Sequence, residues 1–388
     1  MFACSFRLRV RAISSSTILV LTIVLPGIPP ERGRSRPWCC KTSWRTRPSL
    51  KSGYTLAALK LDIAYWNYDR TRALTDGTVR IDGVDLNYRS DVIVSDIFER
   101  MIRNREFDVA ELGMTFYLRT LDLADSPFIA IPVFPNRFFR HSSVFINKAS
   151  GISKPQDLAG KTVGELRTYG HDAGIWAKGI FADDYGVTPD QCRWIIGGAD
   201  KPEPPHDFIP QPHPPNVDVK PAPADKALGQ MLASGEIDAM FSAIVPQCML
   251  KGAPTVARLF EDYETVERDY FARTAIFPMM HTLVIRKDVH EKHPGLARKL
   301  YDGFSAAKDL AVKQYLGATM FHHAPMMIPW FSKLMDENRR LMSDNWWPYG
   351  VEANRKAVDT FLRYHFEQGL SKRRLTCEDI FVPELLDT

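Results

Sequence analysis

The sequence lacks a hydrophobic run long enough to cross a bilayer. The apolar stretch at residues 18–25 is far shorter than the roughly 20 residues that a transmembrane helix needs. Metal and phosphate motifs are missing too, since no HExxH, HxH or CxxC spacing and no glycine-rich phosphate loop occurs. These absences argue against membrane-spanning, metal-dependent and nucleotide-dependent classes, although they do not exclude a metal held by residues from distant parts of the sequence.

Cysteine is scarce, with six residues in 388, and three of the six lie before residue 41. The other three, Cys192, Cys248 and Cys377, are widely scattered. An odd number without close spacing argues against a disulfide framework and against a zinc site. A reducing cytoplasm is the predicted location.

Neither sign of charge dominates once the sequence is divided. The formal net charge is +4, but residues 1–54 contain ten Lys or Arg and a single acid, Glu31. This leaves 40 of the 50 basic and 45 of the 46 acidic residues in the rest of the chain, which is therefore slightly acidic. Because the rest of the chain has no excess of basic residues, nucleic acid is not expected as a partner, and nothing predicts a membrane partner.

The N-terminal segment is similar to an export signal in one respect. Arg7, Arg9 and Arg11 precede the short apolar run, but no small-x-small cleavage site follows, and the residues before Cys39 do not form a lipoprotein box. We expect residues 1–56 to be a disordered extension, whether upstream sequence joined by a misassigned start, a degenerate export signal or a functional tail. If it works as a signal, the location would be periplasmic instead of cytoplasmic.

Strand and helix patterns alternate from about residue 57, which predicts an α/β protein with mostly parallel sheets. Two similar segments, 106–110 and 236–240, each end a helix and enter an apolar run, through either a repeated unit or chance. The length allows two domains. The predicted elements are strands at 59–65, 86–88, 107–110, 161–164 and 277–287, and helices at 94–105, 172–185 and 294–315.

Nine prolines fall within residues 201–224. Proline lacks the backbone donor and fixes φ, so this segment is predicted to be a loop and neither a helix nor an internal strand. Whether the loop covers a site or projects into solvent stays open, and a solvated insertion is favoured.

A short polar and aromatic cluster at residues 136–143 is the leading candidate for a functional site. Its sequence is NRFFRHSS, and it runs directly into the apolar residues 144–146. Guanidinium groups bind carboxylates through paired N–H donors, and imidazole transfers protons near neutral pH. The cluster therefore predicts a site for a small anionic aromatic molecule, with a carboxylate as the leading ligand class.

Three segments together resemble the type 2 periplasmic-binding-protein fold. They are residues 153–165 (SKPQDLAGKTVGE), 235–239 (GEIDA) and 284–288 (VIRKD), the last followed by a His-Pro pair. The resemblance implies two α/β lobes joined by two crossover hinge strands, with the ligand between the lobes. Lobe 1 would hold residues 57–143 and 278–388, and lobe 2 residues 144–277 with the proline-rich loop 201–224.

A narrower resemblance is to the 4,5-dihydroxyphthalate decarboxylases. It rests on residues 68–71, 136–143, 280–282, 349–350 with 354–355, 363–365 and 368–371. It implies a cofactor-independent carboxy-lyase that converts 4,5-dihydroxyphthalate to 3,4-dihydroxybenzoate in aromatic catabolism. The partner would be a small aromatic carboxylate, and a homo-oligomer is an option. The alternatives are a solute-binding protein that delivers a small carboxylate to an ABC-type transporter, and an enzyme for another hydroxylated aromatic acid.

The fold resemblance implies that residues 142–147 and 280–286 lie on the crossover strands, so that His141 and His281 could face one another across the hinge. Either could donate a proton to the ring carbon, and a buried histidine bonded to backbone is the alternative for each. Glu111 follows an apolar strand, where open α/β sheets present side chains to ligands. It could accept a phenolic hydrogen bond or orient a histidine, or it could cap a helix.

The predicted carboxylate ligands are Arg70, Arg137 and Arg140, with ordinary ion pairing as the alternative for each. Because side chains alternate along a strand, Arg140 and Ser142 would share one face, and Ser143 would lie on the other.

The loop at 166–174 joins a predicted strand to a predicted helix. Tyr169 and His171 lie in it where backbone amides at a helix start can receive an anion, so they would complete the pocket from the second lobe. A para hydroxyl on the substrate can take up electron density, so no organic cofactor is expected. The missing ligand motifs predict no metal.

Overall fold

The structure is a computed structural model that describes residues 58–90, 93–320 and 327–388. The chain separates into a unit of residues Met1–Thr55 and a unit of residues Leu56–Thr388. The predicted disordered extension at 1–56 lies outside the described residues. Every element below belongs to the second unit.

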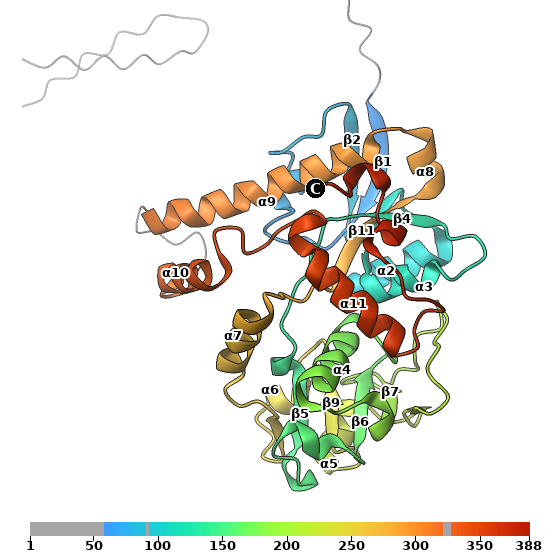
Figure 1. The fold of residues 1–388 in the computed structure, drawn as a ribbon, viewed down its shortest axis with the longest axis vertical. Helices are drawn as coiled ribbons and strands as arrows, with labels where there is room; N and C mark the ends of the chain where they lie inside the picture. The colour runs from blue at the N-terminus through green and yellow to red at the C-terminus, as the bar shows by residue number, and fades with distance from the viewer. Residues whose placement is uncertain (1–57, 91–92, 321–326) are drawn as a thin grey trace, which may run out of the picture. The chain divides into compact units, whose positions relative to one another are not determined.

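Two sheets organise this unit (Figure 1). The first sheet has the order β2-β1-β3-β11-β4, and the second has the order β10-β5-β9-β6-β7-β8. The strands of the first sheet are β1 (Leu59–Ala64), β2 (Val84–Arg89), β3 (Val109–Gly113), β4 (Phe128–Ile131) and β11 (His281–Arg286). Those of the second are β5 (Val144–Asn147), β6 (Thr162–Leu166), β7 (Arg193–Gly197), β8 (Asp218–Pro221), β9 (Ala239–Phe241) and β10 (Val256–Arg258).

Both sheets are mixed, and among the described strands five parallel pairs stand against four antiparallel pairs, in agreement with the prediction of mostly parallel sheets. The parallel pairs are β1 with β2 and β3, and β6 with β7 and β9, together with β7 and β8. The antiparallel pairs all involve β5 or β11, the strands at which the chain passes between the sheets. A helical crossover between neighbouring strands makes them parallel. A strand that enters from the other sheet has no such crossover to its neighbours, so it can run antiparallel to them.

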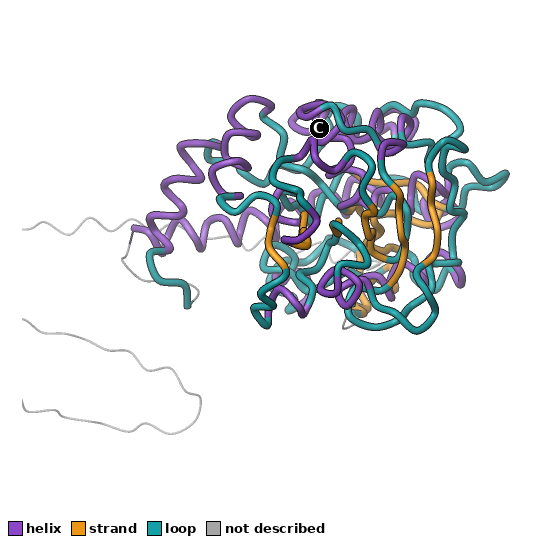
Figure 2. Tube along the Cα trace, turned by 90° about the horizontal axis from the view of Figure 1, so that it is seen from below, coloured by secondary structure: helices purple, strands orange, loops and turns teal. Residues whose placement is uncertain are grey.

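Helices and loops surround the strands (Figure 2). The longer helices are α2 (Val94–Asn104), α4 (Asp172–Tyr185), α7 (Tyr263–Thr274), α9 (Leu296–Met320), α10 (Phe331–Met342) and α11 (Arg355–Glu367). The shorter ones are α1 (Arg72–Thr75), α3 (Met114–Thr120), α5 (Leu228–Ser234), α6 (Gln247–Leu250), α8 (Lys287–Lys292) and α12 (Cys377–Ile380). The 3-10 helices are η1 (His141–Ser143), η2 (Lys148–Ser150), η3 (Pro155–Leu158), η4 (Pro189–Gln191), η5 (Glu352–Asn354) and η6 (Pro383–Leu385).

The predicted alternation of strands and helices is confirmed where hydrophobic periodicity is strong. The helix expected at 172–185 is α4, which ends at Gly186 with φ 68°, a left-handed conformation that glycine adopts without strain. The two similar segments do lead from helix to strand in each sheet, from α2 into β3 and from α5 into β9. The periodic signal locates elements but says nothing about strand direction.

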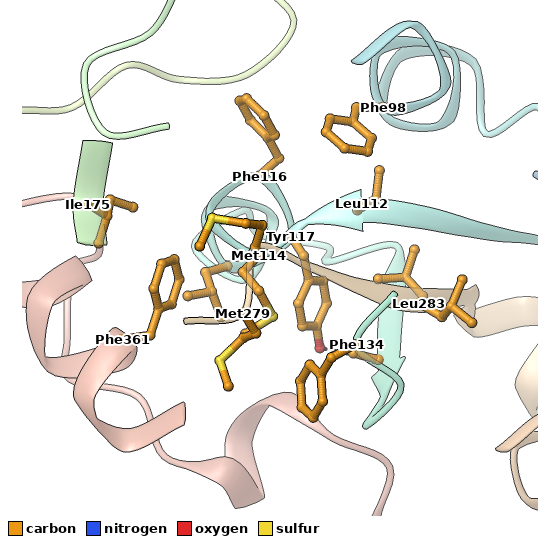
Figure 3. Packing of buried hydrophobic residues seen from close by; sticks show 14 of the residues in the cluster. Phe98, Leu112, Met114, Phe116, Tyr117, Phe134, Ile175, Met279, Leu283 and Phe361 are labelled. Atoms are coloured by element: carbon orange, nitrogen blue, oxygen red, sulfur yellow. Dashed lines mark hydrogen bonds between the residues drawn. The ribbon is translucent and has the colours of Figure 1, made fainter. Parts of the chain in front are cut away.

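Helix α3 packs in a hydrophobic core that also contains residues of α11 and of the segment before β11. Figure 3 shows Met114 and Met279 between Tyr117 of α3 and Phe361 of α11. The Tyr117 hydroxyl donates to the Ile380 carbonyl oxygen at 2.5 Å. The segment after α11 therefore returns to the first sheet, as expected.

Helix α11 itself packs on α4 of the second lobe. The rings of Trp176 and Phe361 lie 5.6 Å apart, and the Tyr364 hydroxyl donates to Asp183 at 2.6 Å. The segment predicted for lobe 1 thus contacts both lobes, and the predicted lobe boundaries stay a prediction.

The proline-rich segment departs from its prediction in one respect. Residues 218–221 form β8, an edge strand, where Pro221 is tolerated because it pairs on one side only. The remainder is only partly solvated, since seven of the nine prolines are exposed while Phe208 is buried with its ring 5.4 Å from that of Phe116. Arg119 of α3 donates to the Pro210 carbonyl oxygen at 3.0 Å. The segment is therefore largely solvated, as favoured, but it is anchored to the first lobe at Phe208 and Pro210.

Candidate active site

A glutamate and a histidine meet on neighbouring strands of the first sheet. His281 pairs with Gly113 across the β3–β11 ladder, and Leu283 pairs with Glu111. Glu111 and His281 are therefore diagonal neighbours on one face, and Gly113 puts no side chain between them. His281 Nδ1 lies 2.6 Å from Glu111 Oε1. With Nδ1 donating to the carboxylate, Nε2 is the nitrogen that can serve a ligand.

Glu111 is completely buried and is held by the segment that follows β1. Its Oε2 accepts from the backbone N–H of Trp66 at 2.9 Å, and its Oε1 accepts from the Tyr68 hydroxyl at 2.7 Å. Burial, reinforced by Glu111, raises the pKa of Tyr68 well above its usual value. The phenol therefore stays protonated and can act only as a donor to this carboxylate.

A second carboxylate–histidine pair comes from the second lobe. Glu165 on β6 is completely buried, and its Oε1 lies 3.2 Å from His171 Nδ1 while its Oε2 lies 2.6 Å from Lys178 Nζ. A side chain at Gly174 would have its Cβ 1.8 Å from Glu165 Oε1, so only glycine allows this packing. Burial lowers the pKa of Lys178 to about 8, against the opposing effect of Glu165.

Asp172, the first residue of α4, connects the two lobes. Its Oδ1 accepts from the backbone N–H of Thr115 on α3 at 2.7 Å. A Cβ on Gly113 would lie 2.4 Å from its Oδ2, and Gly113 is the ladder partner of His281. Burial raises the pKa of Asp172, while the charges of His281 and His171 act in the opposite direction. The two carboxylate–histidine pairs therefore flank one buried carboxyl group.

Arg140 is one of the cations that act on this group. Its guanidinium is buried and interacts with the charge of Asp172. Burial lowers its pKa to about 10. Its Nη1 lies 3.4 Å from Ser143 Oγ, and no carboxylate lies within ion-pair distance in the described ranges. An arginine without a partner acid in a buried position is suited to receive an anionic ligand.

Residues 141–143 form the 3-10 helix η1, and the strand begins only at Val144. The predicted alternation of faces therefore does not hold, because a three-residue turn aligns Arg140 with Ser143. Ser142 uses its backbone, with its N–H donating to Glu267 Oε1 at 2.8 Å. Its hydroxyl is buried and has no partner among the described residues.

His141 and His281 lie in different surroundings. The ring of His141 packs 5.3 Å from those of Phe260 and Tyr270, and neither of its nitrogens has a described hydrogen-bond partner. Burial lowers its pKa to about 4. The two histidines that were expected to face one another thus have different neighbours, and only His281 is paired with a carboxylate.

The remaining predicted residues are engaged elsewhere. Arg70 lies over the rings of Tyr68 and Trp347 and donates to the Pro135 carbonyl oxygen at 2.6 Å. Arg137 donates to the Phe277 carbonyl oxygen at 2.9 Å and lines a separate cavity.

Tyr169 lies in the loop before α4. Its ring is 3.9 Å from Lys178 Nζ, its carbonyl oxygen accepts from Arg119 at 2.8 Å, and its buried hydroxyl has no described partner. It therefore supports the Glu165–Lys178 pair.

Three site residues escaped the sequence analysis, namely Asp172, Glu165 and Lys178. Glu165 and Lys178 lie 13 positions apart on a strand and a helix, a spacing that carries no motif. Asp172 was recognised only as a helix start. The available signal was that Glu165 and Lys178 each lie inside an otherwise apolar segment. A charged residue in a buried strand or helix is normally paired with an opposite charge.

Comparison with known proteins supports a family assignment. The chain is 35% identical over 333 residues to a 4,5-dihydroxyphthalate decarboxylase from Comamonas testosteroni, covering 86% of this chain and 99% of that protein. It is 36% identical over 213 residues to a 4,5-dihydroxyphthalate decarboxylase from Pseudomonas putida, covering 55% of this chain and 81% of that protein. A scan against protein-family models gives no match.

Among solved structures, the periplasmic sulfonate-binding protein SsuA from Methylobacillus flagellatus KT aligns with a TM-score of 0.50 at 14% identity, covering 84% of this chain and 92% of that one. This likeness concerns the fold alone and agrees with a two-lobed, type 2 periplasmic-binding-protein-like architecture. The chain belongs to the 4,5-dihydroxyphthalate decarboxylase family.

Proposed function

We propose that the protein is a decarboxylase that converts 4,5-dihydroxyphthalate to 3,4-dihydroxybenzoate without an organic cofactor. The observation that carries the proposal is the Glu111–His281 pair, buried at the lobe interface of a chain that shares 35% identity with a decarboxylase of that name. A histidine oriented by a carboxylate can hold and release a proton, which is the one chemical task that this reaction sets.

The reaction exchanges carbon dioxide for a proton at one ring carbon. Protonation of the carbon that bears the carboxylate, with loss of the proton from the para hydroxyl, gives a dienone. Cleavage of the C–C bond then releases carbon dioxide, returns two electrons to the ring and leaves a phenolate, which regains a proton. The ring itself is the electron sink, so the protein has to bind, donate a proton and stabilise charge.

In this proposal His281 Nε2 donates the proton to the ring carbon. Glu111 keeps the imidazole in one orientation and stabilises its protonated form. Arg140 binds a carboxylate of the substrate, helped by the hydroxyl of Ser143. His171, held by Glu165, accepts a hydrogen bond from a ring hydroxyl on the opposite side.

The remaining predicted residues have weaker support for contact with the substrate. Arg70 lies next to Tyr68 and can contribute positive potential near Glu111. Four other residues remain predictions, because their described contacts are to the protein itself; they are His141, Arg137, Ser142 and Tyr169.

Within the described ranges we find no helix with the length and apolar character that a bilayer crossing requires. The cytoplasmic location and a homo-oligomeric state are also predictions.

A turnover assay tests the proposal. Purified protein, incubated with 4,5-dihydroxyphthalate and no added cofactor, is expected to release carbon dioxide and to form 3,4-dihydroxybenzoate. Phthalate, which lacks the para hydroxyl, is the matched negative substrate, and other hydroxylated aromatic acids test the alternative of a related enzyme. Tight binding of 4,5-dihydroxyphthalate without any product would overturn the proposal in favour of a solute-binding protein.

A further inference from the structure

A cavity of about 270 Å³ lies away from the Glu111–His281 pair. None of the residues that line it is Glu111, His281, Asp172, His171 or Arg140. Its walls come from α7 and the residues after it, from the end of α10, from the segment between α10 and α11, from the start of α11, and from Arg137. The cavity therefore belongs to a different part of the structure from the proposed active site.

The charge of this cavity is one-sided. Among the described residues, Arg137 and Lys356 are the only ionisable ones that line it, and no acidic residue of those ranges does. Arg137 is 4% exposed and has no carboxylate within ion-pair distance in the part of the chain that the structure describes. A buried cation without a counter-ion is costly, and a bound anion would offset that cost.

The hydrogen bonds of Arg137 leave donors unused. Its Nη1 donates to the Phe277 carbonyl oxygen at 2.9 Å, and its Nη2 donates to the Pro348 carbonyl oxygen at 2.7 Å and to Asn354 Oδ1. Its Nε–H has no acceptor among the described residues, although the atom is buried. A guanidinium carries five N–H donors, so these neutral oxygens fix its position without satisfying its charge.

The other walls are aromatic. Phe271, Phe277 and Trp346 contribute rings, and Asn345 and Asn354 contribute amides. A cation among aromatic walls is suited to a flat anion that can stack and form paired hydrogen bonds at once. The volume is just below the about 300–1,000 Å³ of pockets for drug-sized ligands, which favours a molecule with one ring.

We infer that this cavity is a second ligand site, which binds a small aromatic carboxylate at Arg137. The site is independent of the proposed decarboxylation, because it shares no lining residue with the Glu111–His281 cluster. Arg137 links the two segments that lead into β5 and β11, because it forms an isolated β-bridge with Met279 and donates a hydrogen bond to the Phe277 carbonyl oxygen. A ligand here therefore contacts the chain where it passes between the lobes.

Calorimetric titration of the full chain with benzoate tests the inference. We expect Ala353→Trp, which fills the rim of the cavity, and Lys356→Glu, which reverses its charge, each to weaken binding at this site at least tenfold. Both positions are exposed, so neither change disturbs the core. Lys251→Glu, an exposed reversal on the second lobe, is the matched control and should bind benzoate like the wild type. Benzamide, a neutral molecule of the same shape, should bind at least tenfold more weakly than benzoate.

Arg140→Ala separates the two sites. This variant is expected to keep the benzoate site that Ala353→Trp removes, whether or not the protein turns over 4,5-dihydroxyphthalate. The inference is overturned if Ala353→Trp and Lys356→Glu bind benzoate with wild-type affinity and stoichiometry, or if Arg140→Ala abolishes all benzoate binding while its melting temperature is unchanged. Because binding is measured directly, absence of decarboxylation would reject the proposed function and leave this result intact.

Discussion

His281 Nδ1 and Glu111 Oε1 lie 2.6 Å apart on antiparallel neighbouring strands, although the two residues are 170 positions apart in the chain. The contact depends on Gly113, which faces His281 in the ladder without a side chain of its own. The carboxylate fixes which nitrogen of the imidazole carries the proton toward a ligand. Catalysis in the proposed reaction therefore depends on a pair that neither strand could form alone.

The first prediction concerns this pair. Glu111→Gln keeps the shape of the side chain and one acceptor oxygen, which can serve either Trp66 or Tyr68 but not both, and it removes the charge that stabilises the protonated imidazole. We expect kcat for 4,5-dihydroxyphthalate to fall by about 10²- to 10⁴-fold with a much smaller change in KM, the range that a positioned acid or base contributes. Steady-state carbon dioxide release measures it. An unchanged kcat in a variant with a normal melting temperature would remove Glu111 from the mechanism.

Arg140 is predicted to act in binding. Arg140→Ala removes the guanidinium that has no acid partner, so we expect KM to rise at least tenfold, because a charged hydrogen bond contributes about 1.5–3 kcal/mol. Arg374→Ala, at an exposed position near the C-terminus, is the control. Equal KM values for the two variants would show that another cation holds the substrate.

Asp172→Asn is predicted to stabilise the protein at neutral pH. Burial raises the pKa of Asp172 in the folded state, so the folded form loses stability relative to the unfolded form as pH rises from about 4, the ordinary value. Asparagine keeps an acceptor for the Thr115 N–H and carries no buried charge. The melting temperature of the variant should exceed that of the wild type at pH 7, and the difference should shrink toward pH 4. A variant that melts lower at pH 7 contradicts this account.

Lys178→Met is predicted to destabilise the second lobe. The substitution leaves the Glu165 carboxylate buried without its cation, and breaking a buried pair in this way costs about 3–5 kcal/mol. The double variant Glu165→Gln with Lys178→Met should recover part of that loss, because no unpaired charge remains. Urea denaturation measures the free energies of unfolding. If the double variant is as unstable as the single one, the loss comes from packing and not from charge.

His141 is predicted to affect stability and not turnover. Burial lowers its pKa to about 4, so the unfolded state takes up a proton near its ordinary value of 6.5 while the folded state does not. Stability is therefore lost as pH falls from 6.5 to 4, by up to about 3 kcal/mol at 1.36 kcal/mol per unit.

His141→Phe, which suits the aromatic surroundings of Phe260 and Tyr270, should remove that part of the pH dependence and keep kcat. Melting curves between pH 4 and 7, with the turnover assay beside them, check both statements. A variant with normal melting curves that has lost turnover would return His141 to the catalytic role first predicted for it.

The sequence by itself determined the alternation of elements and the family. Periodicity placed α4 at its observed bounds, and segments such as 153–165 carried the resemblance that the comparisons support. A hydrophobic pattern depends only on residues that are close together in the chain, so it can be recognised in the sequence alone. The same patterns do not record strand direction, so they could not show that β5 and β11 run antiparallel to their neighbours.

Only the tertiary structure decided which polar residues meet. Periodicity could not show that residues 141–143 turn as a 3-10 helix, or that His141 packs against aromatic rings while His281 pairs with Glu111. Nor could it pair Glu165 with Lys178 or bring Asp172 to Thr115, because these contacts join separate elements. Side chains distant in sequence are brought together by the packing of whole elements, and that packing is decided by the core as a whole and not by any one segment.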